Sequence, residues 1–113
     1  MHELALSQSI VDLVCECGRR EGFQSITRVV VEMGVAAAVE PEALAFCFDV
    51  VAADTMARDA ELVIERIAIE AACRACGAEF EMPHLAAPCP QCGAYGARLL
   101  RGRELRVKSL DGE

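Results

Sequence analysis

Aromatic residues are scarce in this chain of 113 residues, which has no tryptophan, one tyrosine and four phenylalanines. Its core must therefore consist mostly of valine, isoleucine, leucine and alanine, and a chain of this length can bury only one modest core. No run of apolar residues is long enough to span a bilayer, and the first residues lack the basic and apolar regions of a secretory signal. With 54% hydrophobic and 26% charged residues, the composition is typical of a globular protein, which we expect in the cytoplasm.

Positive charge is also scarce. The chain has 11 Lys and Arg residues against 18 Asp and Glu residues, which gives a formal net charge of −7. A protein that binds the phosphate backbone of nucleic acids needs a basic surface, so we expect no nucleic-acid partner, and without a membrane segment we expect no membrane partner. Several of the few cations fall between Arg98 and Lys108, where they form a short basic strip.

The first third of the chain predicts a helix followed by a strand. Apolar residues at helical spacing form one stripe, and Gly22 is typical of the residue that closes such a helix. β-Branched residues from Ile26 to Met33 then predict a strand that ends at Gly34. The helical stripe comprises Leu6, Ile10, Leu13, Val14 and Cys17, which leaves Cys15 off the stripe and partly exposed.

The remainder predicts a second helix and two more strands around a cysteine-rich insert. Glu40-Pro41-Glu42 is typical of a helix start, because proline is tolerated in the first turn and acids suit the N-terminal dipole. The apolar stripe of this helix comprises Leu44, Cys47, Phe48 and Val51. Strands are predicted at residues 61–70 and 104–110, the latter preceded by a short strand at 98–101.

This order predicts an α+β fold in which two helices pack on a small, mainly antiparallel three-stranded sheet. A four-cysteine zinc-ribbon module is inserted into the sheet. We expect residues 1–70 and 97–113 to form the α+β domain and residues 71–96 to form the zinc-binding module.

Two C-x-x-C-G motifs predict a metal site. Cys73 and Cys76 form the first motif, Cys89 and Cys92 form the second, and 12 residues separate the two. A C-x-x-C turn lets two thiolates converge on one ion, and the glycine that follows permits the tight turn around the sulfurs. Four cysteine ligands fill the tetrahedron of Zn²⁺ and leave no position for a reacting water, so we expect structural zinc.

Three alternatives explain paired cysteines less well. Thioredoxin-like redox chemistry needs a single C-x-x-C that opens a helix, and disulfides are unfavourable in the cytoplasm. A rubredoxin-type iron site shares the motif but usually has a dense aromatic shell, which this insert lacks. We expect Cys17 and Cys47 to act as small hydrophobic residues, because both fall on predicted apolar stripes.

The N-terminus, Met1-His2-Glu3, predicts a second and different metal site. We expect Met1 to survive processing, because its excision usually needs a small second residue and His2 is large. The Met1 amine and the His2 amide then close a five-membered chelate, and the His2 amide and Nδ1 close a six-membered one. Such nitrogen-rich, nearly planar sets suit Ni(II) or Cu(II). The opposing interpretation is a frayed terminus with a solvated imidazole, which the dipeptide alone would favour.

These features occur together and in a fixed order: Met1-His2-Glu3 at the start of a helix, residues 39–44 (Val-Glu-Pro-Glu-Ala-Leu) at the start of another, and then the two cysteine motifs. In this combination the chain resembles, over essentially its whole length, the HypA/HybF family of hydrogenase maturation nickel metallochaperones. Members of that family have a nickel-binding α+β domain and a four-cysteine zinc domain. With a HypB-type maturation GTPase they insert nickel into the large subunit of [NiFe] hydrogenase, and some also serve urease.

The resemblance implies roles for individual residues. Met1, His2 and Glu3 would bind Ni(II) as transient cargo, and Glu40 matches a position where some members place a carboxylate near the nickel. Glu40 is equally well explained as a helix-start acid. The four cysteines, Cys73, Cys76, Cys89 and Cys92, would bind structural Zn(II).

One function from another class competes with nickel delivery. A zinc-ribbon adaptor that mediates protein–protein interaction would need the same cysteine motifs and no nickel. An enzyme is not expected, because the sequence has no Ser-His-Asp set, no phosphate-binding loop and no open zinc position.

Overall fold

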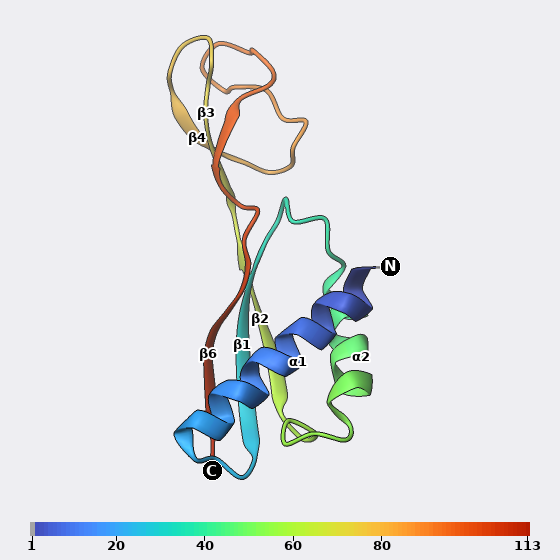
Figure 1. The fold of residues 1–113 in the computed structure, drawn as a ribbon. Coiled ribbons are helices and arrows are strands. Elements are labelled where there is room, and N and C mark those ends of the chain that lie inside the picture. The colour runs from blue at the N-terminus through green and yellow to red at the C-terminus, as the bar shows by residue number, and fades with distance from the viewer. Residues whose placement is uncertain (1) are drawn as a thin grey trace. The chain divides into compact units, whose positions relative to one another are not determined.

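The computed structural model of the chain describes residues 2–113 and contains two helices and six strands (Figure 1). In chain order they are α1 (His2–Glu21), β1 (Ile26–Gly34), α2 (Pro41–Ala52), β2 (Glu61–Ile67), β3 (Ile69–Ala72), β4 (Glu79–Met82), β5 (Arg98–Arg101) and β6 (Leu105–Gly112). Two helices with small, antiparallel-rich sheets confirm the predicted α+β class.

The strands form two three-stranded sheets, with the orders β2-β1-β6 and β4-β3-β5. In the second sheet β3 pairs antiparallel with both β4 and β5. The prediction of one strand over residues 61–70 was wrong in this respect. Ala68 interrupts it, so that β2 and β3 join different sheets, and β4 was not predicted at all.

The chain divides into two compact units. Unit 1 comprises residues 1–31, 39–65 and 106–113, and unit 2 comprises residues 32–38 and 66–105. Unit 1 contains both helices, and unit 2 contains β3, β4 and β5. Unit 2 includes the whole of the predicted 71–96 insert and extends beyond it on both sides.

The buried face of α1 consists of Ser7, Ile10, Val11, Val14 and Cys15, a set at helical spacing that is turned relative to the predicted stripe. Leu13 is 48% exposed and Cys15 is buried, so the prediction for these two residues was wrong. Gly22, with φ 78°, ends the helix as predicted, and the amide of Phe23 donates to the carbonyl of Gly18 at 2.9 Å.

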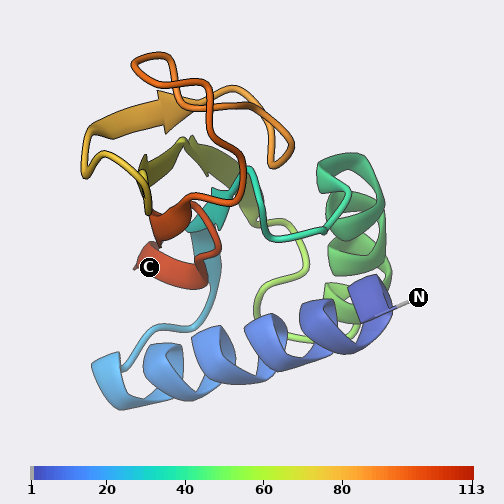
Figure 2. The same ribbon diagram turned by 90° about the horizontal axis from the view of Figure 1, so that it is seen from above.

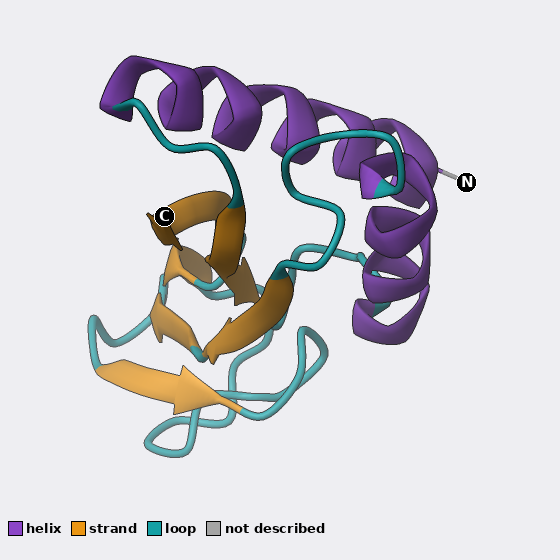
Figure 3. Ribbon diagram, turned by 90° about the horizontal axis from the view of Figure 1, so that it is seen from below, coloured by secondary structure: helices purple, strands orange, loops and turns teal. Residues whose placement is uncertain are grey.

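Helix α2 begins at Pro41, with Glu40 as its N-cap, and packs against α1 through its buried residues Leu44 and Phe48. Figure 2 shows its first turns beside the start of α1. A turn of residues 53–60 then leads to β2, as the long teal connection after α2 in Figure 3 shows.

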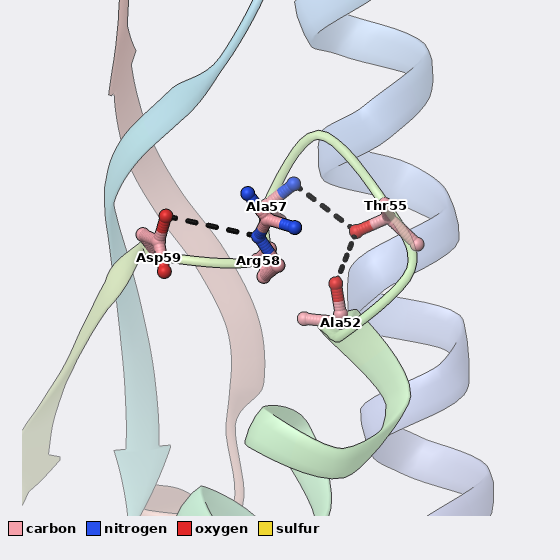
Figure 4. A network of polar contacts seen from close by, with 5 residues as sticks. All are labelled: Ala52, Thr55, Ala57, Arg58 and Asp59. Atoms are coloured by element: carbon pink, nitrogen blue, oxygen red, sulfur yellow. Dashed lines mark hydrogen bonds and ion pairs between the residues drawn. The ribbon is translucent and has the colours of Figure 1, made fainter.

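Thr55 organises that turn (Figure 4). Its hydroxyl donates to the carbonyl of Ala52 at 2.8 Å and accepts from the amide of Ala57 at 3.0 Å, so it caps the end of α2 and starts the return to the sheet. Arg58 and Asp59 form an ion pair of 3.8 Å beside it.

Unit 2 has a small core of its own, formed by Ile69, Ala71, Met82 and Ala87, with Phe80 and Leu99 packed against it. Neither of the two described helices is both long and apolar enough to cross a membrane.

Candidate metal centres

The two cysteine motifs of unit 2 bring four sulfur atoms together. Cys73 follows strand β3 directly, and the sulfurs of Cys73, Cys76, Cys89 and Cys92 all lie within 4.8 Å of one another. Cys73 and Cys89 are buried, whereas Cys76 and Cys92 are exposed. Each motif therefore contributes one inner and one outer sulfur to the cluster.

The two motifs form the same local structure. The amide of Gly77 donates to the carbonyl of Cys73 at 3.0 Å, and the amide of Gly93 donates to that of Cys89 at 2.8 Å. Both glycines have positive φ, 79° and 78°, a conformation that side chains with a Cβ rarely adopt. The glycine that follows each C-x-x-C is thus required by the turn.

The backbone of the motifs points hydrogen-bond donors at sulfur. The amides of Ala75 and Cys76 lie 3.4 Å from the Cys73 sulfur, and the amide of Gln91 lies 3.3 Å from the Cys89 sulfur. The amides of Cys76 and then Ala75 lower the pKa of Cys73 to about 6, since they stabilise its thiolate. The pKa of Cys89 is also lowered, chiefly by the amide of Cys92.

The distances between sulfurs fit a tetrahedral metal and not a disulfide. Cys73 and Cys92 are 3.5 Å apart at their sulfurs, and Cys76 and Cys89 are 3.7 Å apart. A disulfide bond is about 2.05 Å long. Four thiolates about 2.3 Å from one Zn²⁺ would lie roughly 3.8 Å from one another. The four cysteines fit a closed, four-thiolate metal site, as the sequence predicted.

The predicted nickel residues lie where α1 begins. Met1 is outside the described residues, His2 is exposed as the first residue of α1, and Glu3 is partly buried. The pKa of Glu3 is lowered, first by a hydrogen bond from its own backbone amide and also by the amide of Glu40. The Glu3 carboxylate is therefore held in its charged form at the end of the helix that bears positive partial charge.

The structure brings Glu40 to this end of α1. Its amide donates to Glu3 Oε2 at 3.5 Å, while its own carboxylate accepts from the amide of Glu42 at 3.4 Å. The carboxylate thus caps α2, which is the helix-start role considered from the sequence.

Among residues 2–113, the four cysteines are the only group of three or more His, Cys, Asp and Glu side chains placed to share a metal ion. His2, Glu3 and Glu40 do not form such a group. A nickel site here would therefore depend on backbone and amine nitrogens, as in the chelate predicted for Met1-His2-Glu3.

One residue of this region was missed from the sequence. Ser7 is completely buried, and its hydroxyl donates to the carbonyl of Leu44 at 3.2 Å, which fixes α1 to α2 one turn after Glu3. The available signal was a serine on the apolar face of an amphipathic helix, because a buried hydroxyl needs a partner.

Comparison with known proteins agrees with this arrangement. The model of the family described as "Hydrogenase/urease nickel incorporation, metallochaperone, hypA" matches residues 1–112. The hydrogenase maturation factor HypA of Geobacter metallireducens is 42% identical over 113 residues, with all of both chains covered. The hydrogenase maturation factor HybF of Klebsiella pneumoniae is also 42% identical with full coverage.

A solved structure has the same fold. The Ni metallochaperone HypA from Helicobacter pylori superposes with a TM-score of 0.70 at 26% identity, over 99% of this chain and 97% of that chain. These matches confirm the resemblance seen in the sequence, and the family is one of metallochaperones rather than enzymes. The chain belongs to the HypA family of hydrogenase maturation and nickel incorporation factors.

Proposed function

We propose that this protein binds Ni(II) at its free N-terminus and delivers it to [NiFe] hydrogenase during maturation, with urease as a second recipient. The ligands are the Met1 amine, the His2 amide and imidazole, and the amide or carboxylate of Glu3. The observation that carries the proposal is a family match that begins at residue 1, together with an exposed His2 at the very start of α1.

The position of His2 and Glu3 in α1 favours amide coordination. A helical amide donates to the carbonyl four residues earlier, and no carbonyl stands four residues before either of them. Replacement of their amide protons by Ni(II) would therefore break no bond of the α-helical ladder. Ni(II) in a nearly planar nitrogen set gains a ligand-field preference that Zn(II) does not have.

Release is as important as binding for a carrier. An ion held at an exposed chain terminus can be approached by the ligands of an acceptor, whereas four thiolates enclose their ion. We therefore assign transient cargo to the N-terminus and a resident Zn(II) to Cys73, Cys76, Cys89 and Cys92. The zinc would hold the two motifs of unit 2 folded, because metal-binding free energy contributes directly to folding in such small sites.

The partners that follow are a HypB-type maturation GTPase and the hydrogenase large subunit, in the cytoplasm. The family match supports work within the hydrogenase maturation machinery. The transfer itself is an exchange of ligands around Ni(II) and makes or breaks no covalent bond of a substrate.

Nickel titration by calorimetry on untagged, zinc-loaded protein tests this assignment. One Ni(II) per chain is expected in the wild type and none in His2→Ala, with zinc content unchanged by elemental analysis. His84→Ala is the matched control, since His84 is the only other histidine and is exposed. A two-residue extension before Met1 should abolish binding as His2→Ala does, because it removes the amine from the chelate.

Equal nickel binding by the wild type and His2→Ala would overturn the assignment. In that case the four-cysteine site would remain, and a zinc-ribbon adaptor without nickel would be the better explanation. Nickel affinity should also fall at mildly acidic pH, because the amine, the imidazole and the amides must all lose protons to bind.

A further inference from the structure

Helix α2 is apolar around most of its circumference. Only Glu42 and Asp49 are charged among its twelve residues. A helix of this kind normally lies in the middle of a core, because no face of it favours water. The composition of α2 therefore leads one to expect neighbours on all sides.

The structure covers only one side of α2. Leu44, Phe48 and Ala52 are buried, but Phe46 is 70% exposed and Val50, one turn later, is 57% exposed. Figure 2 shows α2 in green at the margin of unit 1. Phe46 and Val50 thus form an apolar stripe that the described part of the chain leaves in water.

Acidic residues flank this stripe. Glu42 lies one turn before Phe46, and Asp49 adjoins Val50; neither side chain has an ion-pair partner among residues 2–113. Unit 1 contains thirteen Asp and Glu residues against six Lys and Arg residues, whereas unit 2 contains five of each. The whole negative charge of the chain therefore belongs to the unit that carries the stripe.

This charge selects the kind of partner. A second copy of the chain that used the same face would bring acid against acid, which is unfavourable across an interface. A protein surface with an apolar groove edged by lysine or arginine would cover Phe46 and Val50 and neutralise Glu42 and Asp49 together. Helix-in-groove recognition commonly uses anchors spaced i and i+4, as these two are.

We propose that Phe46 and Val50 on α2 form the docking surface for the maturation GTPase, through an apolar groove with a basic rim on that partner. This inference rests on the proposed function, because the partner is the one named there. The location suits transfer, since α2 begins beside the predicted nickel residues: the amide of Glu40 donates to Glu3. A partner seated on α2 would be adjacent to the start of α1.

The experiment measures binding of the purified GTPase from the same organism to zinc-loaded, full-length protein by biolayer interferometry. Phe46→Ser with Val50→Ser should weaken binding about tenfold or more, because truncation of central apolar anchors is typically costly. Leu13→Ser is the matched control: Leu13 is an exposed leucine on α1, 48% accessible, and should change the affinity less than about twofold. Circular dichroism checks that all variants keep their helices.

Glu42→Gln with Asp49→Asn tests the charge. This variant should slow association and flatten its dependence on salt, since charges at the border of an interface act mainly on the association rate. If the Phe46/Val50 variant binds the GTPase as the wild type does, or if Leu13→Ser weakens binding equally, the docking surface is wrong. Self-association of the wild type that Phe46→Ser abolishes would likewise overturn it, because the face would then join two copies of this chain.

Nickel titration of the same variants separates this inference from the proposed function. The Phe46/Val50 variant should keep one Ni(II) per chain, because neither residue is a predicted ligand. Loss of nickel binding in His2→Ala with GTPase docking retained would show two separate surfaces. Absence of nickel binding in the wild type would defeat the proposed function and leave the docking measurement to be judged by itself.

Discussion

Glu3 and Glu40 are joined by a hydrogen bond from the Glu40 amide to the Glu3 carboxylate, across 37 residues of sequence. Ser7 and Leu44, each four residues further along, are joined in the same way across the same 37 residues. The first two turns of α1 and α2 are therefore held in one register. This pairing places the predicted nickel residues on a firm support, although they lie at the end of the chain.

Loss of the Ser7 hydroxyl should weaken this support. Ser7→Ala leaves the carbonyl of Leu44 buried without its donor, which typically costs about 1 to 2 kcal/mol. Urea unfolding followed by the helical circular dichroism signal measures it, because both helices belong to unit 1. Ser9→Ala is the matched control, since Ser9 is exposed on the same helix. A Ser7→Ala variant as stable as Ser9→Ala would contradict the role given to this bond.

Glu40 can be tested as a cap and as a ligand separately. Glu40→Ala should destabilise α2 by about 1 kcal/mol, whereas Glu40→Ser should restore most of the loss, because serine is a good N-cap. Since the carboxylate accepts from the Glu42 amide, we expect Glu40→Ser to bind nickel as the wild type does. Calorimetric titration of both variants decides the matter, and a Glu40→Ser variant that is stable but has lost nickel would establish the carboxylate as a ligand.

Zinc binding should release protons at neutral pH. Cys73, with a pKa of about 6, is already a thiolate at pH 7. The amide of Ala94 lowers the pKa of Cys92, but the Cys73 thiol, burial and the other two thiols outweigh it and raise that pKa to about 11. The pKa of Cys76 is raised as well, so roughly two protons should leave per Zn²⁺.

Calorimetry in two pH 7 buffers of different ionisation enthalpy measures this release, and identical heats in both would contradict it. The sign with pH follows from the depressed pKa of Cys73. Its thiolate stabilises the metal-free fold fully above the ordinary cysteine pKa, and that contribution is lost as the pH falls through about 6. Zinc affinity should therefore decline more steeply below pH 6 than above it.

Close backbone packing at the end of β1 should not tolerate a side chain. A Cβ at Gly34 would overlap the carbonyl of Gly102, which accepts from the amide of Ala36 at 2.7 Å. Gly34→Ala should destabilise unit 2 by about 3 kcal/mol or more, because backbone rather than a flexible side chain must move. Hydrogen exchange of the strand amides in unit 2 reports the loss.

Gly96→Ala is the comparison for Gly34→Ala. Gly96 has a φ of 79°, and a Cβ there would meet no atom within 4 Å, so only the strain of about 1 to 2 kcal/mol applies. Equal protection in the two variants would show that the contact between Gly34 and Gly102 is not tight.

The sequence predicted well those features that depend on local chemistry. The cysteine motifs with their glycines, the Glu40-Pro41 helix start and the closure of α1 at Gly22 each need particular residues at particular positions, and the structure contains all three. The division of residues 61–70 at Ala68 was not predictable in this way, because the apolar pattern continues through Ala68 without interruption. Only pairing with distant strands separates β2 from β3.

The connection between the two helix starts was also beyond the sequence. A buried Ser7 suggests a hydrogen bond, yet the choice of Leu44 as its acceptor depends on how α2 lies against α1. The same holds for α2 itself, whose apolar circumference was readable while the exposure of Phe46 was not. Single-helix patterns define which faces avoid water, but tertiary packing decides which of them are covered.

The last residues of the chain complete the sheet that the first strand begins. Strand β6 forms one edge of the β2-β1-β6 sheet, and Glu113 exchanges hydrogen bonds with Ser25. During synthesis, therefore, α1 and β1 emerge first but must wait for β6, while all four cysteines emerge before it. The protein can acquire its zinc while still attached to the ribosome, but its nickel-carrying half reaches the native fold only after translation ends.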